Sequence, residues 1–214
     1  MRLNDDAAFA IPFCDGYWSR LLNRRYHYEA EIEVFLRSAA RDRFFFVDCG
    51  ANFGYWSVLA SSRPFGSQSA LAIEASSANA QRLTRNSDLN GNRFRCLNAA
   101  VCGENGGFAR VVGGRHEKLG TIALAQSEPD CVDTVSLDGL AESGLIDSTI
   151  PVVVKLDVEG VEIEALKGGR GLLVGNCLVV CEEHGADRTH AVSRHIANET
   201  AMKLGELSGP WASS

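Results

Sequence analysis

Short apolar runs alternate with stretches of helical periodicity along most of this chain. Apolar runs at residues 44–47, 70–73, 151–156 (interrupted by Lys155) and 178–181 are bounded by polar residues or glycine, which is typical of buried strands. Several of these strands are followed directly by a predicted helix. This repeated strand–helix order favours an α/β fold with a doubly wound, mostly parallel Rossmann-like sheet and helices on both faces.

The helices are predicted from the spacing of apolar residues. Residues 29–40 place Ile32, Phe35, Leu36 and Ala39 on one face, so an amphipathic helix precedes the first strand. Asn90-Gly91-Asn92 is a signal for a helix end followed by a turn. Further helices are predicted at 54–61, 77–89 and 161–167, the last of them closed by Gly168-Gly169.

The middle and the end of the chain have weaker patterns. The middle predicts a strand at 94–97, a hairpin of 110–112 with 121–124, an exposed or edge strand at 132–136 and a short helix at 138–143. After residue 185 the chain is polar and helical, and no further apolar strand is found. We therefore divide it into an N-terminal segment with its amphipathic helix (1–43), a central domain (44–185) and a C-terminal helical extension of that domain (186–214), with a truncated domain as the alternative.

Composition places the chain among ordinary globular proteins. It has 214 residues, of which 45% are hydrophobic and 22% charged, enough for one domain with a sizeable core. The net charge of −6 argues against a nucleic-acid partner, because such proteins usually carry a basic stripe. No apolar run reaches the roughly 20 residues of a membrane helix, and the N-terminus lacks the pattern of a signal peptide. We expect a cytoplasmic protein without a membrane partner.

The seven cysteines have no regular spacing and are expected to be reduced. Cys49, Cys177 and Cys181 fall in or beside predicted buried strands, where we expect core thiols. Cys177 and Cys181 are four residues apart on one predicted strand, or about 13 Å, which is too far to share a metal ion without a bend. A zinc site is therefore not expected there.

A glycine turn follows the first strand and contains the strongest candidate site. Asp48 ends the strand, and Gly50 and Gly54 permit close approach of the backbone to a ligand. The spacing differs from the G-x-G-x-x-G of dinucleotide sites, and an acid ahead of it would repel a pyrophosphate. It suits a cationic or amine-bearing ligand. Asn52 either caps the following helix or binds a ligand carboxylate.

Other strands also end in acidic residues, at the edge where parallel strands place their carboxyl ends. Glu74 follows Gly54 by 20 positions (74 − 54), where an acid can accept both hydroxyls of a ribose. The alternative is a solvated carboxylate. Lys155, Asp157 and Glu159 alternate at the end of another strand and so share one side. They form either an internal ion-pair network or a site that positions a reacting group.

The strand at 178–181 ends in Glu182-Glu183-His184. Glu183 or His184 is a candidate general base, and His184 has a suitable ordinary pKa. The alternative is a solvated loop. Together with Asp157 and Glu159 these side chains are chemically able to hold a divalent ion, but they lack tight ligand spacing, and no metal is expected.

These residues occur in segments that resemble the FkbM-type, S-adenosylmethionine-dependent class I methyltransferases. The most specific feature is the K-L-D-V-E-G-x-E run downstream of the D-x-G-A-N-x-G turn. Either segment alone would be weaker evidence. The similar segments follow the family's order: FVDCGANFGYWSVLA (46–60), AIEAS (72–76), NAAVCGENG (98–106), VDTVSLDGL (132–140), VVVKLDVEGVEIEALKG (152–168) and VVCEEHG (179–185).

The resemblance implies a seven-stranded sheet, S-adenosyl-L-methionine as cofactor and methyl transfer to oxygen, commonly on a sugar, a polyketide or another small acceptor. It further implies that Glu74 holds the ribose. Asp157 and Glu159 would face the methyl group and the acceptor, with Glu183 and His184 as further catalytic candidates. The turn residues Asp48, Gly50, Ala51, Asn52 and Gly54 would line the methionine end, and Ala99 and Ala100 would lie near the adenine.

The chain departs from the family at its end, where two further edge strands are expected and not found. An open sheet edge favours a homo-oligomer or a fusion partner. Two alternatives to the methyltransferase stay open. One is a nucleotide-binding, NAD(P)-type oxidoreductase, which the turn spacing and Asp48 argue against. The other is a truncated, non-catalytic module that binds the cofactor.

Overall fold

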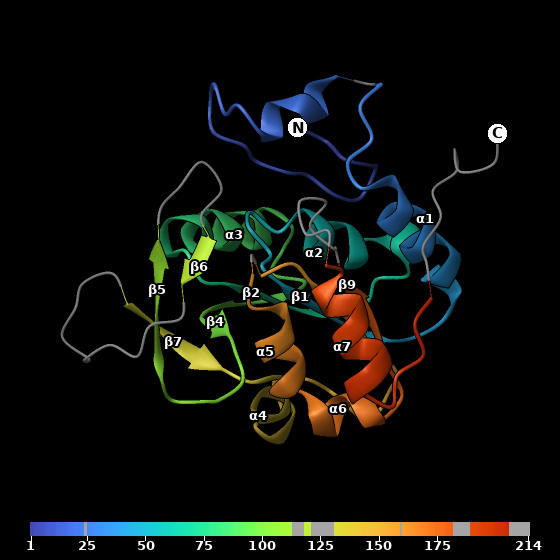
Figure 1. Ribbon diagram of the computed structural model, residues 1–214. Coiled ribbons are helices and arrows are strands. Elements are labelled where there is room, and N and C mark those ends of the chain that lie inside the picture. The colour runs from blue at the N-terminus through green and yellow to red at the C-terminus, as the bar shows by residue number, and fades with distance from the viewer. Residues whose placement is uncertain (24, 113–117, 121–130, 159, 182–188, 206–214) are drawn as a thin grey trace.

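The computed structural model describes the chain except for residues 24, 113–117, 121–130, 159, 182–188 and 206–214 (Figure 1). Its centre is a five-stranded sheet in which all neighbouring strands are parallel. The predicted mostly parallel α/β fold is confirmed. In spatial order the strands are β3 (Arg95–Asn98), β2 (Ser69–Glu74), β1 (Phe45–Cys49), β8 (Val152–Leu156) and β9 (Cys177–Cys181).

A second sheet of four strands lies beside β2 and β3. The strand predicted at 132–136 belongs to it, but the prediction that it is exposed or at an edge was wrong, because it lies between two neighbours. The hairpin predicted from 110–112 is formed with residues 118–120, and its expected second strand at 121–124 lies outside the described residues. The order is β4 (Ala100–Val101), β7 (Cys131–Val135), β5 (Phe108–Val112) and β6 (Lys118–Gly120).

Alternate side chains of the central strands pack against two helical layers (Figure 1). Phe44 and Phe46 point toward the first layer, and Phe45 and Val47 toward the second, as a period of two requires. The first layer holds α1 (Ala30–Ser38), α2 (Tyr55–Ala60) and α3 (Ser77–Leu89), with 3₁₀ turns at Ala39–Arg41 and Arg63–Phe65. The second holds α4 (Leu137–Glu142), α5 (Glu162–Lys167), α6 (Arg170–Val174) and α7 (Ala191–Glu199).

The N-terminal segment crosses the first helical layer and is tied to α3 by buried amides (Figure 1). The Asn86 side chain accepts from the backbone N–H of Ala10 and donates to the carbonyl oxygens of Ala10 and Phe53. Asp6 forms ion pairs with Arg63 and Arg93. These contacts hold the segment so that its 3₁₀ turn, Trp18–Leu22, reaches the edge of the sheet where the strands end.

In the part of the chain that the structure describes, no helix is long and apolar enough to cross a bilayer. Cys49 is buried in the core as predicted, whereas Cys177 and Cys181 are only partly buried, because β9 lies at the edge of the central sheet.

Candidate functional site

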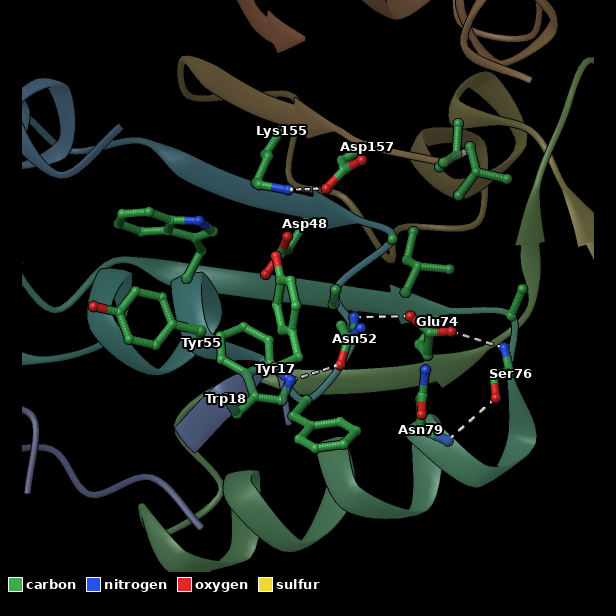
Figure 2. Close-up of a pocket in the computed structure, with 18 of the residues that line it drawn as sticks. Tyr17, Trp18, Asp48, Asn52, Tyr55, Glu74, Ser76, Asn79, Lys155 and Asp157 are labelled. Carbon is green, nitrogen blue, oxygen red and sulfur yellow. Dashed lines mark hydrogen bonds and ion pairs between the residues drawn. The ribbon is translucent and has the colours of Figure 1, made fainter. Parts of the chain in front are cut away.

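A cavity of about 330 Å³ opens at the carboxyl ends of β1, β2 and β8 (Figure 2). This volume lies at the lower end of the range for small-molecule sites, about 300–1,000 Å³. The cavity lies in the crevice where open α/β sheets bind ligands. Polar groups line its sheet side and aromatic rings its other side.

The turn between β1 and α2 forms the floor of the cavity, and four of its backbone N–H groups bind acceptors within the protein. The N–H groups of Gly50 and Ala51 both donate to the carbonyl oxygen of Ile73, at 3.0 and 2.9 Å. The N–H of Asn52 donates to Glu74 at 2.7 Å, and that of Gly54 donates to Ala51 at 2.7 Å. These four amides therefore bind the protein itself and are not available to a phosphate group.

Gly50 is required by the packing of this turn against β8. Its φ is +76°, in the region that favours glycine, and a Cβ at this position would overlap the carbonyl oxygen of Asp157. Glycine was predicted here for a close approach to a ligand. In the structure, the close approach that requires it is to the neighbouring strand end.

Glu74 is held rigidly in the wall of the cavity. One carboxylate oxygen accepts from the N–H of Asn52 at 2.7 Å, and the other from the N–H of Ser76 at 2.8 Å (Figure 2). The side chain is buried. The alternative of a solvated carboxylate is therefore wrong, and the carboxylate has a fixed orientation beside the turn.

Asn52 does not cap α2, so that half of its prediction was wrong. The N-cap residue is Gly54, and no side chain caps the helix. The Asn52 side-chain oxygen instead accepts from the indole N–H of Trp18 at 3.1 Å (Figure 2). The side chain thus links the glycine turn to the N-terminal segment.

Asp48 is a buried acid with one unsatisfied oxygen. Its Oδ2 accepts from the Ser57 hydroxyl at 2.7 Å, whereas its Oδ1 has no hydrogen-bond partner among the described residues. Burial raises the pKa of the Asp48 carboxyl, and the neighbouring Lys155 ammonium and the Ser57 hydroxyl oppose that shift. An unpaired buried acceptor is costly, so this oxygen is suited to a ligand that brings a donor.

Among the described residues that line the cavity, Lys155 is the only one with a cationic side chain. It stands opposite Asp48 in the β1–β8 register and donates to the Asp157 carboxylate at 3.1 Å. Burial disfavours its charge, but the carboxylates of Asp157, Asp48 and Glu29 outweigh burial and raise the pKa of Lys155. The predicted ion-pair network is therefore present, and it lies inside the candidate site.

The aromatic side of the cavity comes from two parts of the chain. Trp18 and Tyr55 stack with their ring centroids 5.8 Å apart, and Tyr28 stacks on Trp56 at 6.0 Å. The hydroxyls of Tyr17 and Tyr28 are 3.2 Å apart. The N-terminal aromatic residues thus pack in the core and also line the cavity.

The structure brings most of the predicted site residues to one cavity. Gly54 and Ala100 are not among those that line it: Gly54 packs against Leu83, and Ala100 lies in a small buried cluster. Glu159, Glu183 and His184 lie outside the described residues. The predicted residues that do line it are Asp48, Gly50, Ala51, Asn52, Glu74, Ala99 and Asp157.

Several lining residues were not predicted from the sequence. Asp15 and Asn79 carry no local signal, since only the folded path of the chain brings them to the cavity. Ser76 was detectable as the N-cap of α3, where its hydroxyl accepts from the N–H of Asn79. Within the part of the chain that the structure describes, no group of three or more histidine, cysteine or acidic side chains is placed to hold a metal ion.

Comparison with known proteins places this site in a family. The family model for the Methyltransferase FkbM domain matches residues 48–198. The chain has the fold of a methyltransferase FkbM from Methylobacillus flagellatus KT, with a TM-score of 0.52 and 21% identity over 74% of this chain and 38% of that one. It is also similar to the N-terminal domain of human METTL16, with a TM-score of 0.45 and 12% identity over 90% and 67%.

This chain thus spans 38% of the length of the FkbM structure that it resembles. No curated protein matches it. The family match covers more than half of the chain and includes the glycine turn, Glu74 and the Lys155–Asp157 pair. The chain therefore belongs to the FkbM methyltransferase-domain family.

Proposed function

We propose that this protein is a methyltransferase that uses S-adenosyl-L-methionine to methylate a hydroxyl group on a small molecule, a glycan or a polyketide. The observation that carries the proposal is the chemistry of the cavity floor. Four of its backbone N–H groups donate to acceptors within the protein, and the buried carboxylates of Asp48 and Glu74 flank it. Such a floor suits a cofactor that has no phosphate groups and carries positive charge.

The same floor argues against the oxidoreductase alternative. Dinucleotide sites bind a pyrophosphate through the N–H groups of a glycine turn at a helix N-terminus. Here the N–H groups of Gly50, Ala51, Asn52 and Gly54 already have acceptors, and Asp48, which precedes the turn, lines the same cavity. A pyrophosphate would therefore meet negative charge without these four donors.

The residues of the cavity fit the parts of the proposed cofactor. The unpaired Oδ1 of Asp48 suits the ammonium group at the methionine end, and Glu74 suits the ribose hydroxyls. Ala99 and Val101 line the cavity beyond Glu74, where an adenine ring would find apolar contacts. When bound, the cofactor supplies an activated methyl group on a sulfonium.

The chain's own residues then have to align the acceptor and exclude water. The rings of Tyr17 and Tyr28, which come from the N-terminal segment, line the cavity. Lys155 fixes the orientation of the Asp157 carboxylate, which can accept a hydrogen bond from the acceptor hydroxyl. For removal of the hydroxyl proton, Asp157, Glu159, Glu183 and His184 are our candidates.

Transfer of a labelled methyl group tests this proposal. The protein is incubated with methyl-labelled cofactor and a panel of glycosides and polyketides. We expect label in an acceptor, loss of that label in Asp157→Asn, and retention in the control Asp133→Asn, which changes an exposed acid on β7.

Two further titrations separate the alternatives. Binding of NADH, without binding of S-adenosylhomocysteine, would replace the proposal by the oxidoreductase. Binding of S-adenosylhomocysteine with no transfer to any acceptor would favour the non-catalytic module.

A further inference from the structure

Glu29 is an acid beside the cavity that the sequence did not assign to the site. It is the N-cap residue of α1, where its backbone has a φ of +43° and a ψ of +61°. A residue other than glycine is uncommon in this left-handed region. The Glu29 side chain does not cap the helix. Its carboxylate instead accepts a hydrogen bond of 2.6 Å from the indole N–H of Trp56, a buried residue that lines the cavity.

The position of Glu29 brings it close to the ion pair of the site. A second cleft, which extends from α1 to β9, is lined by Glu29 and shares Lys155 and Asp157 with the cavity. Burial lowers the pKa of Lys155, but the carboxylates of Asp157, Asp48 and Glu29 more than offset burial. Carboxylates from three separate parts of the chain therefore act on one ammonium group.

The negative groups around Lys155 outnumber the positive ones. Asp157 is bonded to the Lys155 ammonium at 3.1 Å. The buried Oδ1 of Asp48, which has no hydrogen-bond partner among the described residues, suits the ammonium group of the proposed cofactor. Glu29 is held by the indole of Trp56, a neutral donor, so that bond does not cancel its negative charge. The site can therefore accept a further positive charge.

A further positive charge is what distinguishes the proposed cofactor from its product. S-adenosyl-L-methionine carries a sulfonium, and S-adenosylhomocysteine has a neutral thioether at the same position. Their amino and carboxylate groups are identical. A fixed negative charge near the cavity attracts the first more strongly than the second, because the interaction of two charges is stronger near a protein than in bulk water.

We propose that Glu29 selects between the two forms of the cofactor: its carboxylate, held by Trp56 at the edge of the cavity, favours the sulfonium form relative to the neutral product. The inference rests on the proposed use of S-adenosyl-L-methionine. It adds to that function a residue outside the glycine turn and the carboxyl ends of the strands, and it assigns to this residue a part in product release.

The ratio of two affinities tests this role. Calorimetric titration gives the Kd of S-adenosyl-L-methionine and that of S-adenosylhomocysteine for wild type and for Glu29→Gln. The variant should lose about 3- to 10-fold of its relative affinity for the sulfonium form, the order expected for one charge acting over roughly 10 Å in a partly hydrated site. A merely structural role of Glu29 would weaken both ligands alike and leave the ratio unchanged.

Three further variants show whether the charge and its position are responsible. Glu29→Asp keeps the charge and should keep most of the preference. Trp56→Phe keeps a ring and Glu29 but removes the bond that holds the carboxylate, so the preference should fall in part. Glu33→Gln removes an acid of the same helix that pairs with Arg37, and it should leave the ratio as in wild type. Circular dichroism checks that each variant folds.

The outcomes separate this inference from the proposed function. If neither ligand binds to folded wild type, the proposed function fails and the inference fails with it. If both ligands bind and the ratio is equal in wild type and Glu29→Gln, the inference alone is overturned, as it is if Glu29→Asp loses the preference to the same extent. A ratio that falls in Glu29→Gln and persists in Glu29→Asp supports it. Should Glu29→Gln not fold, the ratio in Trp56→Phe decides in the same way.

Discussion

Two edges of the central sheet differ in how they are finished. At the carboxyl ends of β1 and β2, backbone donors, buried carboxylates and the N-terminal segment form one connected network around a cavity. At the outer side of β9 there is an uncharged strand beside a cleft that contains both exposed apolar and charged side chains. The same sheet therefore presents one edge organised by polar contacts and one edge with exposed apolar side chains.

The difference separates two kinds of binding surface. Polar groups held in fixed positions select a ligand by its charge and its donors, as a cofactor requires. An apolar strand edge selects little by itself and gains stability from pairing with another strand. Variants that disturb the polar network should therefore change stability and cofactor affinity.

The largest expected effect comes from removing the cation of the polar network. Lys155→Met leaves the carboxylates of Asp48 and Asp157 without their common counter-ion. Breaking a buried ion pair by removing one partner costs about 3–5 kcal/mol, and we expect a loss of that size at neutral pH. Urea denaturation measures it. The control is Lys167→Met, which removes an exposed ion pair with Glu164 and should change stability by less than about 1 kcal/mol.

The raised pKa of Lys155 also predicts how the stability of the protein changes at alkaline pH. The pKa of Lys155 is raised in the folded protein above its ordinary value of 10.5. Its stabilisation is therefore fully present below that value and is lost as the pH rises through the folded pKa. Wild-type stability should fall in this alkaline window more steeply than that of Lys155→Met. Equal pH profiles for the two proteins would contradict this view of Lys155.

A smaller effect is expected where the glycine turn meets β8. Gly50→Ala would press a methyl group into the Asp157 carbonyl, whereas Gly91→Ala has a similar φ of +72° and no atom within 4 Å of the new methyl group. Both share the backbone strain, so their difference isolates the overlap. We expect Gly50→Ala to be less stable by about 1–3 kcal/mol, as in other overpacked sites. Equal losses would mean that the turn moves freely away from β8.

The smallest effect is expected at the link between the turn and the N-terminal segment. Trp18→Phe keeps a ring in the aromatic wall and removes the hydrogen bond to Asn52. A single hydrogen bond contributes roughly 0.5–1.5 kcal/mol, and thermal unfolding should show a loss in that range. The control is Trp56→Phe, which removes the bond to Glu29 and leaves the Asn52 contact intact. Unchanged stability in Trp18→Phe would show that this contact does not hold the segment.

Local patterns in the sequence were sufficient to predict the main elements. The helix predicted at 77–89 agrees with α3 at both ends, because its N-cap serine and its Asn-Gly turn are local signals. The strand alternation and the carboxyl-end acids were likewise readable. The helix α6 was missed because Gly168-Gly169 was interpreted as a stop. In the structure a Cβ on Gly169 would crowd Leu137, so the glycine serves helix packing.

Long-range contacts were not predictable in this way. The Trp18–Asn52 hydrogen bond joins residues 34 positions apart, and no pattern near either residue indicates it. The interior position of β7 depends on its pairing with β5, which the alternation of its own side chains does not show. The sequence therefore indicated three of the acids that line the cavity, Asp48, Glu74 and Asp157, and the fold supplies the partners that orient them.

Calorimetric titration with S-adenosylhomocysteine tests the central claim most directly. Wild type and the control Glu142→Gln, changed at an exposed acid on α4, should bind alike. Glu74→Gln should bind about 10- to 100-fold more weakly, the equivalent of the roughly 1.5–3 kcal/mol of a hydrogen bond to a charged group. Absence of binding to folded wild type, or equal affinity in Glu74→Gln, would contradict the assignment of this cavity to the cofactor.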